Sequence, residues 1–358
     1  MNFNAPLVRS IRILLFPLSL VYALVVWIRN RLYDKNVFQS TSFNLPIICV
    51  GNLSVGGTGK STMVEFIAKL FHQKYPLAIL SRGYKRKTKG YALANEKSTA
   101  LEIGDEPMQF YLKFPKLAVA VGEERVVAIP QILHDRPDTR VIVLDDAFQH
   151  RSVKAGLSIL LTEYNNLFTR DWFLPTGDLR DEKSSSKRAD IIVVTKCPSE
   201  LGESLAASIK EEIVPLPHQH VFFSSIQYGE PYHISKKHSL KIASNLEVLL
   251  VSGIANPAPL KEYLHENSRT YYEMLFGDHH IFTIDDWKEI VKRFDSIQNN
   301  NKIILTTEKD AVRLVKFGNE IRDLPLFVIP IEMKLLFNGQ QRFEQALTGF
   351  IESYSVKS

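Results

Sequence analysis

Residues 51–62, GNLSVGGTGKST, combine closely spaced glycines with a lysine and hydroxyl side chains, which is typical of a phosphate-binding loop. An apolar run precedes the loop and a stretch with helical spacing follows it. In this arrangement backbone N–H groups surround phosphate oxygens, Lys60 reaches the β- and γ-phosphates, and Ser61 offers its hydroxyl to Mg²⁺. Ser54 replaces the first glycine of the usual G-x-x-x-x-G-K-[ST] pattern. The residues expected around the phosphates are Ser54, Val55, Gly56, Gly57, Thr58, Gly59, Lys60, Ser61 and Thr62.

A pair of acidic residues follows a second apolar run. Asp145 and Asp146 directly follow the apolar run at residues 140–144. A strand that brings a carboxylate to the carboxyl edge of a parallel sheet is the usual partner of a phosphate-binding loop, where it holds Mg²⁺ directly or through water. The alternative, two acids that merely begin a surface loop, is weaker because the phosphate loop is already present. We therefore expect Ser61, Asp145 and Asp146 to hold the metal ion.

Two further segments contain candidates for a general base. GDEP at residues 104–107 places Asp105 at the start of a helical stretch, where a carboxylate that caps the helix is the simpler interpretation. FGDHH at residues 276–280 is open to three interpretations: half of a metal site, a base held by an acid, or a surface loop. Side chains of both segments could act as a general base beside the phosphate site.

The composition indicates a globular protein of about two domains. The chain has 358 residues, 45% of them hydrophobic and 23% charged, so it can bury a large core, and disorder is not expected. Its two cysteines, Cys49 and Cys197, lie in apolar runs, which excludes a disulfide framework and fits a reducing compartment. The net charge is +5, and we expect neither a nucleic-acid ligand nor an obligate protein partner.

Residues 1–36 differ from the rest of the chain. Residues 13–28 are almost entirely apolar, and basic side chains flank them. This run is short for a membrane span, and no small-residue cleavage site follows it. A buried core helix is one alternative, but a helix that lies in the membrane interface, with Tyr22 and Trp27 at headgroup depth, explains more of the pattern. We expect a membrane-associated helix whose removal leaves the phosphate site largely intact.

Strand and helix signals alternate along residues 37–220. Strand-like runs lie at 46–50, 77–80, 116–121, 140–144, 157–161 and 191–194, with helical stretches at 61–72, 105–113, 123–134 and 199–213. A second series comprises strands at 247–251, 303–305 and 326–329 and helices at 259–265 and 285–294. Such alternation predicts α/β architecture with mostly parallel sheets. We expect a P-loop NTPase-like core domain, 37–220, and a smaller C-terminal α/β domain, 221–358.

Taken together, the motifs resemble those of the tetraacyldisaccharide 4′-kinase family, the lipid A kinases of Gram-negative envelope synthesis. The resemblance covers most of the chain. Besides the segments already quoted, it rests on SRGY at 81–84, LDDAFQHR at 144–151, LPTGDLRD at 174–181, VVTK at 193–196 and LTTEKDAV at 305–312. It implies ATP as donor, Mg²⁺ as metal, and transfer to the 4′-hydroxyl of a membrane-bound acylated glucosamine disaccharide 1-phosphate. It also implies a location at the cytoplasmic face of the inner membrane of a Gram-negative bacterium.

The resemblance implies roles for particular residues. Lys60 matches the lysine of the family's phosphate loop, Asp105 matches the base toward the 4′-hydroxyl, and His279 matches the histidine that assists it from the second domain. The family tends to have glutamate after Arg180, so the role of the shorter Asp181 stays open. The residues expected to bind the acceptor or line its cleft are Arg82, Tyr84, Arg125, Gln149, His150 and Arg180.

Other functions fit parts of the sequence. A membrane-associated P-loop NTPase that acts as a regulatory or metal-chaperone switch has the same loop, but it has no need of an Asp-His-His segment in a second domain. The runs at 194–197 and 308–310 resemble the guanine-reading motif of GTPases only faintly. An ATP-dependent ligase requires an acyl-phosphate site, which we do not find in the sequence.

Overall fold

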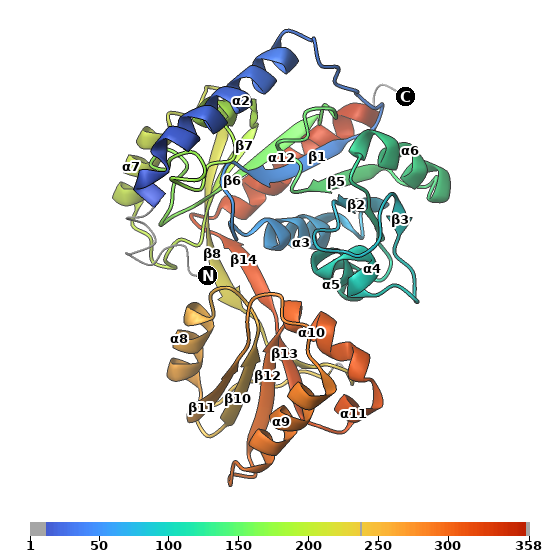
Figure 1. The fold of residues 1–358 in the computed structure, drawn as a ribbon, viewed down its shortest axis with the longest axis vertical. Helices are drawn as coiled ribbons and strands as arrows, with labels where there is room; N and C mark the ends of the chain where they lie inside the picture. Colours follow the sequence, from blue (N-terminus) through green and yellow to red (C-terminus); the bar gives the residue numbers. More distant parts are fainter. Residues whose placement is uncertain (1–11, 237, 356–358) are drawn as a thin grey trace.

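The structure, a computed structural model, describes residues 12–236 and 238–355 (Figure 1). The strands form a nine-stranded sheet and a five-stranded sheet, and helices cover both sheets (Figure 1). The predicted α/β fold, with a large and mostly parallel sheet and a smaller second α/β unit, is confirmed. The first eleven residues of the expected N-terminal helix lie outside the described residues.

The large sheet has the strand order β14-β8-β7-β6-β1-β5-β2-β4-β3. Its neighbouring strands are parallel except for the pairs β3/β4 and β14/β8. The strands are β1 (Ile47–Asn52), β2 (Leu77–Ser81), β3 (Ala92–Leu93), β4 (Ala118–Val121), β5 (Val141–Asp145), β6 (Leu157–Glu163), β7 (Ile191–Thr195), β8 (His220–Tyr228) and β14 (Ile331–Leu335). β1, which leads into the glycine-rich loop, is therefore the central strand.

Both faces of the large sheet are buried, which explains why its strands are continuous apolar runs. In β1, Ile48 and Val50 pack with the helices of one face, whereas Ile47 and Cys49 pack with those of the other. The first face is covered by α3 (Lys60–Phe71), α5 (Asp105–Lys113) and α12 (Gly339–Ser355), and the second by α6 (Arg125–Asp135) and α7 (Glu203–Ile213). Two short elements, α4 (Ala100–Ile103) and the 3-10 helix η1 (Lys183–Arg188), lie in connections.

The small sheet has the strand order β11-β10-β12-β13-β9, in which only the β13/β9 pair is antiparallel. Its strands are β9 (Tyr232–His233), β10 (Glu247–Ser252), β11 (Thr270–Leu275), β12 (Lys302–Thr307) and β13 (Leu326–Ile329). One face packs against α8 (Ala258–Asn267), and the other packs against α9 (Ile284–Asp295) and α10 (Glu308–Leu314). The 3-10 helix η2 (Val315–Phe317) and α11 (Asn319–Arg322) follow α10.

The chain passes between the two sheets twice, on adjacent strands. β8 pairs with β7 through its first residues and with β14 through its later ones. β14 leads back to α12, whose Phe343, Leu347 and Ile351 are buried in the core of the large sheet. Residues 331–355 therefore belong with the large sheet, so sheet membership does not follow the single boundary expected at residue 220. The pattern concealed this return because β14 alternates half-buried and exposed residues.

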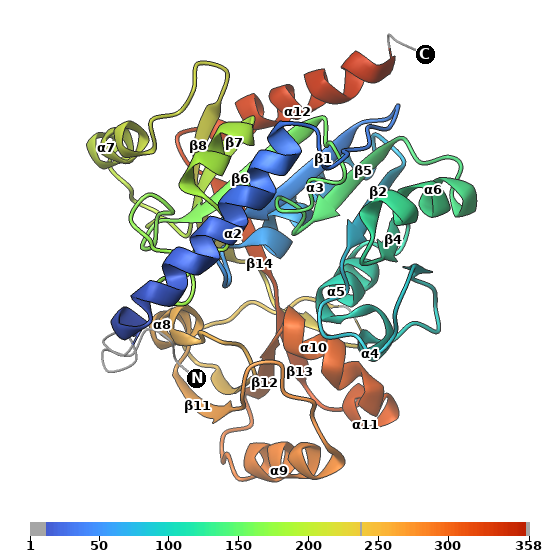
Figure 2. The same cartoon turned by 45° about the horizontal axis from the view of Figure 1, so that its top comes forward.

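α2 (Phe16–Asp34) runs beside the large sheet in the region of β6 and β7 (Figures 1 and 2). Only Ser19, Val26 and Asn30 are buried along its length. The alternative of a buried core helix is therefore wrong, since most apolar side chains of α2 face outward. Within the described residues, no helix combines the length and apolar character that crossing a membrane requires.

The two units meet where α5 packs against α10. Val312 of α10 is buried with Ile103 and Met108 of the large unit. Beside this contact, Lys113 Nζ lies 2.7 Å from a carboxylate oxygen of Glu65 and 2.7 Å from one of Glu308. One lysine therefore joins two carboxylates, one from each unit.

Burial and the nearby Glu308 carboxylate raise the pKa of Glu65 to about 7, from an ordinary value of 4.5. Since the folded protein holds this proton more tightly than the unfolded chain does, the free energy of unfolding falls as pH rises through the interval between those two values. We expect Glu65→Gln to reduce this fall, measured as the urea midpoint across that interval. Glu332→Gln, whose exposed carboxylate pairs with Lys69, is the control and should follow the wild type. Parallel profiles for wild type and Glu65→Gln would contradict the assignment.

Candidate active site

The loop between β1 and α3 has the backbone geometry of a phosphate cradle. Gly56 and Gly59 have φ values of 107° and 85°, in the left-handed region that costs a residue with a Cβ about 1–2 kcal/mol. Gly59 is also the residue before α3, and no side chain caps the helix. The free N–H groups of the first turn of α3 are therefore available to an anion, in the direction that the helix dipole favours.

The departure at Ser54 has a structural explanation. Ser54 forms an antiparallel bridge with Leu179, and the N–H of Val55 donates to the carbonyl of Asp178 at 2.8 Å. Ser54 does not have a positive φ, unlike Gly56. Because this part of the loop runs along a neighbouring segment, it does not require glycine.

Lys60, Asp146 and Arg180 come together at the base of the loop. Lys60 Nζ lies 3.3 Å from Asn52 Oδ1 and 3.8 Å from Asp146 Oδ1. Arg180 donates to Asn52 Oδ1 at 2.5 Å and forms an ion pair with Asp146. Burial lowers the pKa of Lys60, although Asp146 opposes this effect. Burial acts to raise the pKa of Asp146, but Lys60 and Arg180 hold it below its usual value.

Asp145 lies deeper than Asp146, at the end of β5. Its Oδ2 accepts a hydrogen bond from Ser81 Oγ at 3.0 Å. Burial, with the neighbouring carboxylates of Asp146 and Glu106, raises the pKa of Asp145 to about 6. Because these neighbouring carboxylates disfavour the ionisation of Asp145, a bound cation would be stabilised among them.

The oxygen donors at this edge of the sheet fit Mg²⁺, which prefers carboxylates, hydroxyls and phosphate oxygens. Ser61 lies in the first turn of α3, while Asp145 and Asp146 come from the end of β5. In the part of the chain that the structure describes, no three His, Cys, Asp or Glu side chains form a metal-binding group. The expected ion would therefore need the hydroxyl and the nucleotide phosphates as further ligands.

Asp105 contacts the second unit through two side chains. Its Oδ2 lies 2.8 Å from His279 Nδ1, and Arg313 donates to both carboxylate oxygens, at 2.5 and 3.1 Å. Burial acts to raise the pKa of Asp105, but the bonds with His279 and Arg313 hold it well below its usual range. The simpler interpretation of Asp105 as a helix cap is wrong, because Gly104 precedes α5 and no side chain caps it.

His279 is positioned by the loop that follows β11. It has a φ of 62°, and its N–H donates to the carbonyl of Gly253 at 3.2 Å. Asp310, fully buried on α10, accepts from the N–H of Gly253 at 3.0 Å. His280 instead hydrogen-bonds Asp286 at 2.9 Å, so it supports the start of α9. The two histidines therefore have different functions, and the metal half-site is not formed.

Glu106 connects the two halves of the site. Its charge acts on both Lys60 and Asp145, and Lys309 Nζ lies 3.4 Å from its carboxylate. Lys309 Nζ also lies 3.3 Å from His279 Nε2. The sequence did not predict Asn52, Glu106, Lys309 or Arg313 as site residues. For Lys309 and Arg313, the one sequence feature that indicates a shared role is their four-residue spacing, which puts them on one face of a helix.

Four of the remaining predicted residues lie around the rim: Arg82, Tyr84, Gln149 and His150. Arg82 and Tyr84 are exposed, and the Tyr84 ring lies edge-on to His279 with 6.2 Å between ring centroids. Gln149 donates to the carbonyl of Asn52 at 2.8 Å. Burial, with the guanidinium groups of Arg125, Arg82 and Arg29, lowers the pKa of His150 to about 4, so its imidazole is neutral at pH 7. His150 thus lies in positively charged surroundings.

Arg125 and Asp181 do not face the cleft. Arg125 is fully buried and donates to the carbonyl of Gly122 at 2.7 Å and to that of Asp145 at 3.3 Å, so it supports Asp145 from behind. Asp181 is fully buried and accepts from Asn30 at 2.8 Å and from Arg188 at 2.9 Å. Asp181, whose role the sequence left open, therefore connects α2 to the large unit.

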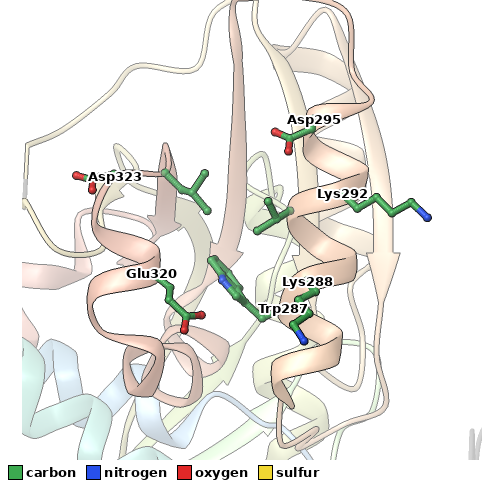
Figure 3. Close-up of a pocket in the computed structure, with 8 residues that line it drawn as sticks. Trp287, Lys288, Lys292, Asp295, Glu320 and Asp323 are labelled. Atoms are coloured by element: carbon green, nitrogen blue, oxygen red, sulfur yellow. The ribbon is translucent and has the colours of Figure 1, made fainter.

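A separate groove lies between α9 and α11 of the second unit (Figure 3). Its lining residues are Trp287, Lys288, Val291, Lys292, Asp295, Glu320, Asp323 and Leu324. None of them contributes to the phosphate loop or to the contacts of Asp105. The groove is therefore not part of the candidate active site.

A phosphate loop on the central strand of a parallel sheet, with a separate carboxylate that could activate an acceptor, is the arrangement of a P-loop kinase. A family model described as tetraacyldisaccharide-1-P 4′-kinase matches residues 11–352. The chain belongs to this family, as its motifs predicted, and it is accordingly a phosphotransferase.

Individual relatives agree over nearly the whole chain. The tetraacyldisaccharide 4′-kinase of Flavobacterium johnsoniae is 45% identical over 346 residues, which cover 96% of this chain and 98% of that protein. That of Bacteroides thetaiotaomicron is 42% identical over 358 residues, covering 96% and 94%. A structure of LpxK from Aquifex aeolicus in complex with ATP has a TM-score of 0.76 at 28% identity, covering 95% and 99%. The alternative of a regulatory or metal-chaperone switch is not supported.

Proposed function

We propose that this protein transfers the γ-phosphate of ATP to the 4′-hydroxyl of an acylated glucosamine disaccharide 1-phosphate, with Asp105 as the general base. The observation that carries the proposal is the position of Asp105. Its carboxylate is held by His279 and Arg313 of the second unit, while the adjacent Glu106 acts electrostatically on Lys60 and Asp145. An acceptor hydroxyl beside Asp105 would therefore lie near the phosphates of a bound nucleotide.

The phosphate loop provides the donor half of the site. The N–H groups around Gly57 and the first turn of α3 bind the phosphates, and Lys60 contacts their outer oxygens. Ser61, Asp145 and Asp146 would hold Mg²⁺, which neutralises phosphate charge when it is bound. Phosphoryl transfer depends mainly on positioning and charge neutralisation, so these groups need only one base in addition.

The acceptor half requires that a sugar hydroxyl lose its proton as the new P–O bond forms. The pKa of Asp105 lies below its usual range, so the carboxylate is ionised at neutral pH and is available as an acceptor. Because a sugar hydroxyl is a very weak acid, its proton moves late, when the oxygen already bonds to phosphorus. His279 and Arg313 fix the orientation of the carboxylate for this step.

Catalysis therefore depends on closure of the second unit over the large one. His279 and Arg313 reach Asp105 only across the contact between the units. A site that is complete only in this arrangement limits transfer of phosphate to water when no acceptor is present.

The proposal is tested by incubating the protein with γ-labelled ATP, Mg²⁺ and the acylated disaccharide 1-phosphate. We expect a labelled 4′-phosphorylated product, and we expect Asp105→Asn and His279→Ala to lower kcat by about 10²-fold or more with little change in ATP affinity. His280→Ala is the matched control, because this neighbouring histidine contacts Asp286 instead. No product from the wild-type protein would contradict the kinase reaction. Undiminished turnover in both variants would contradict only the assignment of the base.

We propose further that the outward face of α2 seats the protein on the cytoplasmic surface of the inner membrane, where the acyl chains of the acceptor remain. The helix turns its polar residues toward the protein: Ser19 and Asn30 are buried, whereas Leu20 and Leu24 are 56% and 55% exposed. Trp172 is exposed beside this face and contacts Phe16 edge-on. An apolar face of this size is unfavourable in water and is stabilised by a lipid interface.

The double variant Leu20→Glu/Leu24→Glu should bind vesicles of phosphatidylethanolamine and phosphatidylglycerol about tenfold more weakly, because two leucines no longer enter the apolar layer. Ile284→Glu is the control: this residue is 45% exposed on α9, at the end of the molecule opposite α2 (Figure 1). Co-sedimentation with vesicles measures both. Equal binding by the double variant and the control would exclude α2 as the attachment surface.

A further inference from the structure

Residues 178–181 lie between α2 and the phosphate loop and contact both. On the loop side, the N–H of Val55 donates to the carbonyl of Asp178, and the N–H of Arg180 donates to the carbonyl of Leu53, each at 2.8 Å. The guanidinium group of the same Arg180 pairs with Asp146. This short segment therefore shapes the start of the loop and positions a cation beside the metal-binding carboxylates.

On the other side, α2 holds this segment through polar contacts. Tyr22 Oη donates to the carbonyl of Arg180 at 3.2 Å, and Asn30 Nδ2 donates to Asp181 Oδ1 at 2.8 Å. Asp181 is fully buried, so each hydrogen bond that it accepts compensates part of the cost of its burial. Arg12 adds an ion pair with Asp178 at 2.7 Å. Three residues of the segment thus have a partner in the N-terminal helical region.

A second connection runs from α2 to the loop by another route. Arg29 donates to the backbone carbonyl of Gln149, and Gln149 Nε2 donates to the backbone carbonyl of Asn52 at 2.8 Å. The side chain of Asn52 contacts both Lys60 and Arg180. Both routes from α2 therefore end on the same group of charged side chains.

We propose that α2 is a positioning element of the nucleotide site in addition to its membrane-facing role. Its inner polar face holds residues 178–181 in the place from which Arg180 pairs with Asp146, so that docking of α2 and binding of ATP strengthen each other. Such coupling is reciprocal, because each event stabilises the arrangement that the other requires. The proposal requires ATP at the loop but neither the acceptor, nor Asp105 as base, nor a membrane. It predicts the opposite of the expectation from the sequence, in which the N-terminal segment can be removed with the phosphate site largely intact.

The first test measures the affinity of the detergent-solubilised full chain for Mg·ATP without acceptor. We expect Tyr22→Phe/Asn30→Ala to weaken binding about threefold to tenfold, since it removes two bonds to the segment that carries Arg180. Arg31→Ala is the matched control. Its side chain is 56% exposed and contacts Asp34 and the Trp27 ring, neither of which lies in residues 178–181, so this variant should bind as the wild type does. Unchanged affinity in the double variant would overturn the proposal.

The second test uses the wild-type chain, so it does not depend on the folding of a variant. Saturating Mg·ATP should slow hydrogen exchange of the backbone amides of residues 19–30 by about threefold or more, because nucleotide binding stabilises the docked helix. A purely structural role for α2 leaves this exchange independent of ATP, and that result would overturn the proposal. Since no acceptor is present, neither outcome depends on the kinase reaction.

Discussion

The contact of Asp105 with His279 and Arg313 joins the two units at the candidate active site. It joins residues separated by 174 and 208 positions in the chain, and it links the two sheets at the point where an acceptor would bind. Desolvation alone would raise the pKa of this carboxylate, and the two partners reverse the effect. In the proposed mechanism, this half-buried carboxylate therefore stays ionised, and available as a base, because the second unit is in place.

The large sheet provides the fixed part of this arrangement. β1 and β5 are neighbours, so the glycine-rich loop and the acidic pair emerge at the same edge of the sheet. The return of β14 and α12 to the large core anchors the chain on both sides of the second unit. The second unit is thus joined to the large sheet by two adjacent strands, and it packs against α5. α2 supports the opposite side of the loop.

Features contained in one short stretch of sequence were predictable. The phosphate loop and Asp145–Asp146 follow buried strands, whose continuous apolar runs are readable because both faces of the sheet are covered. Asn52 and Arg313 were not predictable in this way, since their function arises from contacts with residues distant in sequence. The same holds for Asp105, whose local pattern favoured a helix cap although its partners lie on another unit. The family resemblance implied that Asp105 and His279 act together, whereas the local sequence pattern left their roles open.

We propose that Asp105 and its partners from the second unit act as one catalytic group. A double-mutant cycle on kcat for phosphate transfer, with Asp105→Asn, Arg313→Met and the double variant, measures whether they do. If Arg313 acts through Asp105, the double variant should be no more than about threefold slower than Asp105→Asn alone. If the two losses multiply, Arg313 acts independently of Asp105, and the account is contradicted.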